Sequence, residues 1–240
     1  MSRRAAAVVA VVALLSLIAL GQAPDLHPQS DDQQPAIPTV TFTLDWPGAE
    51  PEHYTLAVDS SGKAAYESRG GSKYQLGDAY SFKFTVSEAT RNRIFDTART
   101  LNYFNGKFDY HKGKIAFTGT KTLTYADNAR RFETSYNWSE NAKLRQLTEL
   151  LQGVATTLEF GRSLDYLYRH DKLGLNAELK RMDELAGAGQ LAELQALGPQ
   201  LERIAGDSHV MEIARQKARR LLQRANAGMP GTSSQTAAQR

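Results

Sequence analysis

The sequence predicts an α+β protein in which an N-terminal, mostly antiparallel sheet with one inserted helix is followed by a C-terminal helical bundle. Between residues 39 and 138, apolar side chains recur at every second position, which is typical of strands with one buried face. From Ser139 onward they step by three and four, which is typical of amphipathic helices. The 240 residues include no cysteine, so disulfides, thiolate metal sites and cysteine nucleophiles are excluded.

Three runs of alternating apolar residues predict the first strands. They are Val40, Phe42, Leu44 and Trp46, then Tyr54, Leu56 and Val58, then Phe82, Phe84 and Val86. After the second run, the turn residues Ser60–Lys63 lead into a short strand through Ala65 and Tyr66, which predicts a hairpin. Ser87 and Glu88 then predict the start of the inserted helix, because the serine oxygen can accept from the first free N–H groups and the acid complements the helix dipole.

Two longer strands are expected after the inserted helix, which should end at Asn105 and Gly106. Residues of equal parity are Ile115, Phe117, Leu123 and Tyr125 in the first of these strands, and Phe132, Tyr136 and Trp138 in the second. Asp127 and Asn128 predict the turn between the strands, and Gly119 predicts a bulge or bend within the first.

The helical half is expected to begin at Ser139, whose side chain can cap the first helix. In this helix apolar residues recur three or four positions apart, at Leu144, Leu147, Leu151, Val154 and Leu158. The same spacing predicts later helices with Leu175, Leu179 and Met182, and with Leu191, Leu194 and Leu197. The segment Gly206–Ser208 predicts the cap of a last helix. The expected organisation is a signal peptide at 1–23, a flexible linker at 24–38, a β-rich α+β domain at 39–138, a helical bundle at 139–225 and a disordered tail at 226–240.

The first residues predict export. Arg3 and Arg4 form a positive start, Ala5–Leu20 is apolar apart from Ser16, and Gly21–Ala23 has the small residues of a signal-peptidase site. No cysteine follows, so lipid attachment at this site is excluded, and we expect a periplasmic or secreted protein. The alternative is an uncleaved anchor, in which case the membrane contact is through this segment alone. Cleavage would also remove two of the bases behind the net charge of +3, so we expect no nucleic-acid partner.

Catalytic motifs give no enzyme class. Nucleophile-elbow, phosphate-loop, dinucleotide-binding and His-Glu-x-x-His patterns are missing from the sequence. Ser60–Lys63 matches Ser-x-x-Lys by spacing, but it lies at a predicted hairpin turn, where these residues are common. No histidine has another histidine two to four positions away, so we expect no metal site and no cofactor.

One stretch, Asn102–Lys114, is the candidate binding site because aromatic and basic residues alternate in it. The candidate residues are Tyr103, Lys107, Phe108, Tyr110, His111 and Lys112. Aromatic faces beside cations can stack on sugars or aromatic side chains and can bind anionic polymers. The alternative is that the aromatic rings close the end of the sheet while the lysines are solvated. A second candidate is the basic last helix, with Arg215, Lys217, Arg219, Arg220 and Arg224, although bundle packing also explains its apolar residues.

The run Tyr54–Tyr66, followed by the capped helix at Val86–Glu88 and two strands, resembles small α+β domains of unknown function in exported bacterial proteins. The resemblance covers about residues 39–138 and implies an α+β domain in the cell envelope, without functional residues. We therefore expect a non-catalytic protein-interaction or binding module whose partner is another envelope protein or an anionic polymer. The alternatives are a hydrolase of envelope polymers, which would need a deep pocket lined by two acids, and a small-ligand-binding protein.

Overall fold

A computed structural model describes residues 37–71 and 79–227 of the chain. The predicted signal peptide, the predicted linker up to residue 36 and residues 228–240 of the predicted tail lie outside the described residues. The described residues all belong to one compact unit.

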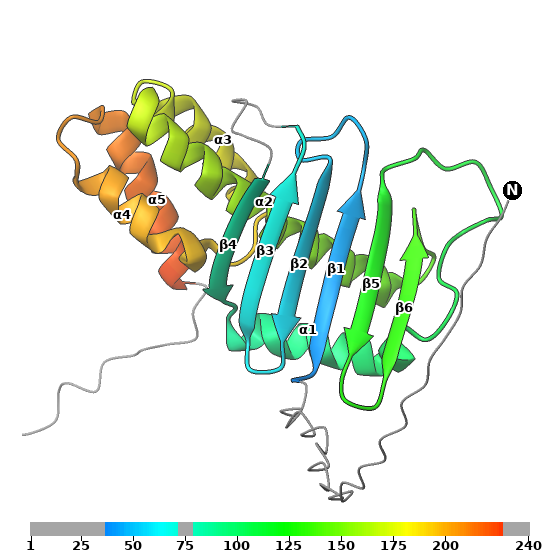
Figure 1. The fold of residues 1–240 in the computed structure, drawn as a ribbon. Coiled ribbons are helices and arrows are strands. Elements are labelled where there is room, and N and C mark those ends of the chain that lie inside the picture. Colours follow the sequence, from blue (N-terminus) through cyan, green and yellow to red (C-terminus); the bar gives the residue numbers. More distant parts are fainter. Residues whose placement is uncertain (1–36, 72–78, 228–240) are drawn as a thin grey trace, which may run out of the picture. The chain divides into compact units, whose positions relative to one another are not determined.

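A six-stranded antiparallel sheet with the order β4-β3-β2-β1-β5-β6 forms the first half of this unit (Figure 1). The strands are β1 (Thr39–Asp45), β2 (His53–Asp59), β3 (Lys63–Arg69), β4 (Ala79–Thr85), β5 (Thr120–Ala126) and β6 (Arg131–Tyr136). The first four form a meander, and the β5–β6 hairpin then adds to the free edge of β1. The sheet and the helices after it confirm the predicted α+β class.

One face of the sheet is buried and the other is open. On β1, Val40, Phe42 and Leu44 are buried, whereas the threonines between them lie on the open face. The strand register continues this pattern, since Thr43 is opposite Thr55 of β2 and Thr122 of β5. The period-two pattern of the sequence therefore records which face of the sheet meets the core.

The sequence places the start of β5 too early. Ile115 and Phe117, expected in this strand, lie in the loop before it and are exposed. The pairing partner explains the difference, because β1 ends at Asp45, which lies opposite Thr120. Gly119, at a φ of +88°, turns the chain just before this point. Trp138, expected in the last strand, lies beyond the end of β6.

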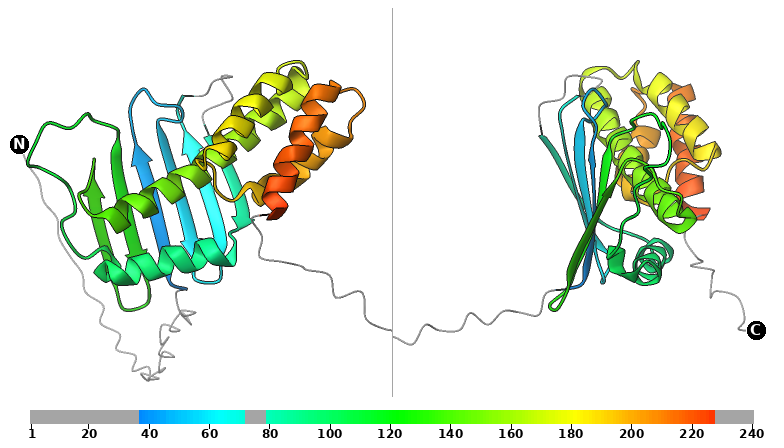
Figure 2. Two further views of the ribbon diagram at one scale, coloured as in Figure 1. Left: turned by 180° about the vertical axis from the view of Figure 1, so that it is seen from behind. Right: turned by 90° about the vertical axis from the view of Figure 1, so that its right-hand side faces the viewer.

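Helices α1 (Glu88–Thr100) and α2 (Ala142–His170) cover the buried face (Figure 2). Ser87 caps α1 as predicted, since its Oγ accepts from the Thr90 N–H at 3.2 Å. The cap of α2 is Asn141 and not the predicted Ser139, because the Asn141 Oδ1 accepts from the Leu144 N–H at 3.1 Å. Ser139 instead accepts a hydrogen bond from the Asn141 N–H just before the helix.

The length of α2 explains where the remaining helices lie. Its 29 residues span about 44 Å at 1.5 Å per residue, whereas six strands span only about 24 Å. The C-terminal turns of α2 therefore extend beyond β4, where the later helices pack around them (Figure 1). These helices are α3 (Leu175–Gly187), α4 (Gly198–Gly206) and α5 (Glu212–Ala227). Two short 3-10 turns complete the described elements: η1 (Asn102–Phe104) follows α1, and η2 (Leu194–Leu197) precedes α4.

The last helix begins later than the sequence predicts. Gly206 ends α4, and Asp207 binds Lys172 and the His209 N–H, so the predicted cap segment forms a turn before α5 starts at Glu212. Buried side chains of the sheet and of all five helices form one continuous hydrophobic core. Across residues 37–71 and 79–227, no helix has the length and apolar character needed to span a membrane.

Candidate functional site

The aromatic and basic stretch predicted as a binding site lies in the loop between η1 and β5. Two hydrogen bonds fix this loop to the chain that leaves β6. The Tyr110 N–H donates to the Trp138 carbonyl at 2.9 Å, and the Asn137 N–H donates to the Asp109 carboxylate at 2.8 Å. The loop is therefore held in one place, although it is neither helix nor strand.

Five of the six predicted residues come together. A hollow of about 400 Å³ is lined by Lys107, Phe108, Tyr110, His111 and Lys112, together with Ser139–Asn141 at the start of α2. Tyr103 lies elsewhere, against β5. Its ring centroid is 4.6 Å from that of Tyr125, and the Arg130 guanidinium lies 4.0 Å above it.

Aromatic and cationic groups, some exposed and some half-buried, lie at the hollow and next to it. The Tyr110 ring meets the Trp138 ring edge-on, with centroids 5.2 Å apart, and the Arg145 guanidinium lies 5.3 Å from the centre of the same indole. The Lys112 ammonium is 4.0 Å from the Glu140 carboxylate, and its side chain is 81% exposed. An ion pair this exposed is weak, so the lysine remains accessible to another anion.

The part of the loop that carries two exposed apolar side chains, Ile115 and Phe117, is bonded to the chain that leaves β6. The Asn137 side chain accepts from the Thr118 N–H at 2.9 Å and donates to the Ala116 carbonyl at 3.1 Å. We call Lys107, Tyr110, Lys112, Ile115, Phe117 and Trp138 the aromatic–basic surface.

A buried lysine supports this surface from beneath. The Lys121 ammonium donates to the carbonyls of Thr118, Gly119 and Asn137 at 2.9 Å, 3.1 Å and 2.9 Å. Burial removes water from this ammonium and lowers its pKa. Lys121 thus ties the loop before β5 to the chain after β6. The period-two pattern could not reveal this role, because it predicts an apolar residue at this buried position of the strand.

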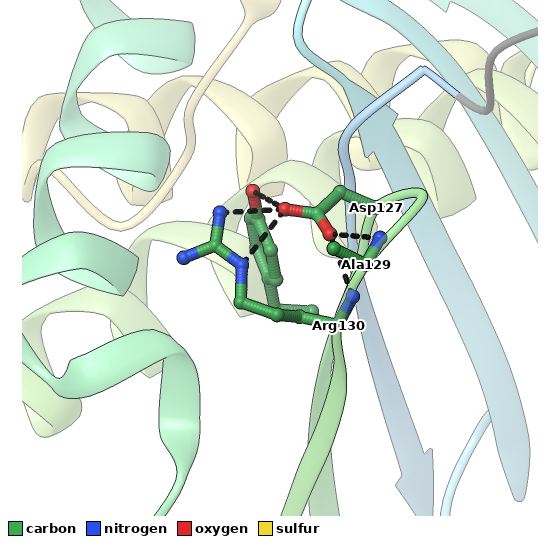
Figure 3. Close-up of polar contacts among 4 residues, drawn as sticks. Asp127, Ala129 and Arg130 are labelled. Atoms are coloured by element: carbon green, nitrogen blue, oxygen red, sulfur yellow. Dashed lines mark hydrogen bonds and ion pairs between the residues drawn. The ribbon is translucent and has the colours of Figure 1, made fainter.

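The Arg130 guanidinium that contacts the Tyr103 ring belongs to a cluster around Asp127 at the β5–β6 turn (Figure 3). The Asp127 carboxylate accepts from the N–H groups of Ala129 and Arg130 at 2.9 Å and 2.7 Å, and from the Arg130 side chain at 2.6 Å. The Arg130 guanidinium is the main reason that the pKa of Asp127 falls to about 2. These contacts close the hairpin, so Tyr103 has a structural partner here.

This carboxylate predicts an acid dependence of stability. An unfolded aspartate titrates at about pH 3.9. The contribution of the Asp127 carboxylate to the free energy of unfolding is therefore complete above that pH, and it is lost as the pH falls towards about 2. Asp127→Asn should therefore be less stable than the original chain at neutral pH. The difference between their free energies of unfolding should decrease between about pH 4 and pH 2. Urea unfolding across this range measures this difference. Asp96→Asn, a change at an exposed acid on α1, is the control, and an equal narrowing for both variants would contradict the prediction.

A second hollow, a cavity of about 450 Å³, lies between the β1–β2 loop, the buried face of β2 and β3, and α2. Trp46, Glu50, Tyr54, Tyr66, Phe160 and Arg181 are among its lining residues. On α2, four half-buried polar residues face it: Gln152, Thr156, Glu159 and Ser163. Their spacing of four, three and four residues places them on one side of the helix. We call these four residues the polar stripe.

Glu159 organises the wall of the cavity. Its Oε1 accepts from the Tyr66 hydroxyl at 2.9 Å and from the Ser68 hydroxyl at 2.6 Å, and its other oxygen is 3.7 Å from the Arg162 guanidinium. Burial raises the pKa of both Tyr54 and Tyr66, which keeps these phenols neutral. Glu50 also lines the cavity, so two acids are present, but Glu159 is already engaged by these three partners. The spacing of the polar stripe was the signal in the sequence that could have indicated this cavity.

The basic last helix is less available for a partner than its sequence indicates. Arg215 and Arg219 pair with Glu212, whereas Arg220 and Arg224 lie 3.4 Å and 3.6 Å from Asp183 of α3. Lys217 is buried and donates to Asn176. Three of these cations therefore join α5 to α3, and the other two pair within α5.

Comparison with known proteins does not identify a function. No protein-family model and no curated protein matches the chain. In the described part of the chain, no three His, Asp or Glu side chains are grouped closely enough to hold a metal ion. The two hollows therefore have to be judged by their own chemistry.

Proposed function

We propose that this protein is an exported, non-catalytic binding module of the bacterial cell envelope that recognises a partner protein through its aromatic–basic surface. The observation that carries the proposal is that two segments joined through Asn137, the loop before β5 and the chain after β6, both carry exposed apolar side chains. Ile115, Phe117 and Trp138 are 39%, 56% and 36% exposed. Large apolar residues exposed singly need no explanation, whereas a group beside cations is typical of an interaction site.

The composition of the surface favours a protein partner over a polymer. Aromatic residues and arginine contribute most of the binding energy in protein interfaces, and Trp138 contacts both Tyr110 and Arg145 here. Lys107 and Lys112 add charge at the rim, which attracts acidic side chains and increases the association rate. A partner with apolar residues next to acidic ones would match both features. A polyanion would use the lysines and leave the apolar side chains exposed.

The proposed location in the cell envelope is argued from the sequence. The positive start, the apolar run and the small residues at Gly21–Ala23 support export, and a chain without cysteine needs no disulfide chemistry after export. The partner is therefore expected among envelope proteins.

Two substitutions test the surface. Tyr110→Ala and Lys112→Ala should each weaken partner binding several-fold, because exposed stacking or charge contacts contribute about 1 kcal/mol. The thermal midpoint should stay nearly unchanged. The partner is first recovered from envelope extract on the immobilised protein, and its dissociation constant is then measured for each variant at low and high salt. The contribution of Lys112 to the binding affinity should decrease as salt is added, because exposed charges are screened over about 10 Å at 0.1 M.

Matched controls exist elsewhere on the chain. Lys83→Ala removes an exposed lysine on β4, and Leu173→Ala removes an apolar side chain that is 72% exposed. Both should leave the affinity unchanged. If Tyr110→Ala instead lowers the thermal midpoint and leaves the affinity intact, the ring only closes the end of the sheet. If polyanions compete fully for the site, the partner is a polymer and the proposal of a protein partner is wrong.

A further inference from the structure

We propose that the cavity beside α2 is a second, independent binding site, and that its ligand is a small neutral saccharide. The feature that points to it is the polar stripe on α2, which faces the exposed indole of Trp46 and the buried phenols of Tyr54 and Tyr66.

The cavity has the size and the walls of a ligand site. Its volume of about 450 Å³ falls within the ~300–1,000 Å³ usual for small-molecule pockets. The walls come from β2, β3 and α2, which belong to the continuous core, so most of the cavity is formed without a ligand. A preformed site loses little conformational entropy on binding.

The polar stripe is unusual for its place in the fold. Where α2 covers the sheet it buries Leu147, Leu151, Leu158 and Leu164, as a helix on a sheet face normally does. The stripe interrupts this pattern with an amide, two hydroxyls and a carboxylate over about 16 Å of helix. The Thr156 hydroxyl donates to the Gln152 carbonyl at 2.9 Å, and Glu159 accepts from Tyr66 and Ser68. The remaining lone pairs of these two groups can accept further hydrogen bonds, so the stripe suits a ligand that carries several hydroxyls.

The charges around the cavity balance. Glu50 and Glu159 line it, Arg181 lines it as well, and Arg162 lies 3.7 Å from Glu159. The Arg181 guanidinium lies 4.8 Å from the centre of the Phe160 ring, which orients it over the wall of the cavity. Two acids and two bases leave no net charge to attract an ion. A neutral ligand is therefore favoured over a carboxylate or an amine.

Trp46 supplies the apolar surface that a sugar requires. The indole is 37% exposed and lines the cavity with the β1–β2 loop. A pyranose ring presents C–H groups on its flat side and hydroxyls at its edge, so one side can stack on an aromatic face while the edge binds polar groups. An indole and a row of polar side chains that line the same cavity match this division.

The two tryptophans of the chain allow binding at the two sites to be followed separately by fluorescence. Trp46 lines the cavity and Trp138 belongs to the aromatic–basic surface. In Trp138→Phe the only remaining indole reports on the cavity. We would titrate this variant with glucose, N-acetylglucosamine, maltose and chitobiose and follow the fluorescence of Trp46. Each titration is repeated on the original chain by calorimetry, which detects binding that does not change the fluorescence.

We expect at least one of these sugars to give saturable binding that does not change with salt. Gln152→Leu should weaken it by about tenfold, which corresponds to about 1.4 kcal/mol. Gln146→Leu makes the same change at an exposed position of α2 outside the stripe and should have no effect. Tyr110→Ala should also leave sugar binding unchanged, which separates this proposal from that of the partner surface.

Three results would overturn the proposal. The first is no saturable signal for any of the four sugars by either method. The second is equal loss of affinity in Gln152→Leu and Gln146→Leu. The third is stronger, salt-dependent binding of glucuronate or glucosamine, which would show that the cavity selects a charged ligand.

Discussion

A fragment of the chain that ends at Asn137 should fail to show the cooperative unfolding transition of the whole protein. The sheet would lose α2, whose Leu144, Leu147, Leu151 and Leu158 are fully or almost fully buried in the shared core. Each buried leucine contributes about 2 kcal/mol of hydrophobic free energy, so the sum approaches the whole stability of a typical domain. Circular dichroism during urea unfolding, together with binding of a dye that reports exposed apolar surface, measures this result.

The matched control is the fragment 37–227, which keeps every described element. This fragment should unfold cooperatively, with a midpoint close to that of the whole chain. If the fragment ending at Asn137 has the same midpoint as fragment 37–227, the sheet is stable without the helices and the prediction is wrong.

Glu193→Ala should cause the largest loss of stability among single polar substitutions, about 3 kcal/mol. The Glu193 carboxylate is buried and accepts from the Ser87 N–H and the Ser87 hydroxyl, both at 2.7 Å, as well as from Thr90 and Gln195. It therefore connects the turn before η2 to the N-terminus of α1, where the helix dipole also favours an anion. Removing it leaves the buried Thr90 hydroxyl and the half-buried donors of Ser87 and Gln195 without this acceptor.

Calorimetry should show this loss as a fall of roughly 10 °C in the thermal midpoint. Glu202→Ala, which removes an exposed glutamate on α4, is the control and should shift the midpoint little. Comparable shifts for the two variants would mean that the buried contacts of Glu193 contribute nothing beyond those of a surface acid.

The two candidate sites differ in how far the sequence could reveal them. The predicted binding site is one continuous stretch, and five of its six candidate residues line one hollow in the structure. Tyr103 lies apart because the chain turns at η1, where its own φ is +57°, and the ring packs on Tyr125. Local sequence shows the residue types of such a stretch but not the direction that each side chain takes.

Errors in the predicted elements have a similar cause. Ile115 and Phe117 alternate as strand residues do, yet no neighbouring strand extends far enough to pair with them. Ser139 is a good capping residue, but the helix starts three residues later, after Asn141. In both cases a local preference is overruled by where the paired or packed partner lies.

The sequence by itself determined the α+β class, the one-sided burial of the strands, the cap at Ser87 and the change from sheet to helices after residue 138. These follow from periodicity and capping, which act over a few neighbouring residues. Only the tertiary structure decided that β5 pairs with β1, that α2 extends past the sheet, and that Trp46, Tyr66 and Glu159 meet around one cavity. These contacts join residues far apart in the chain, and which of them form depends on how the shared core packs.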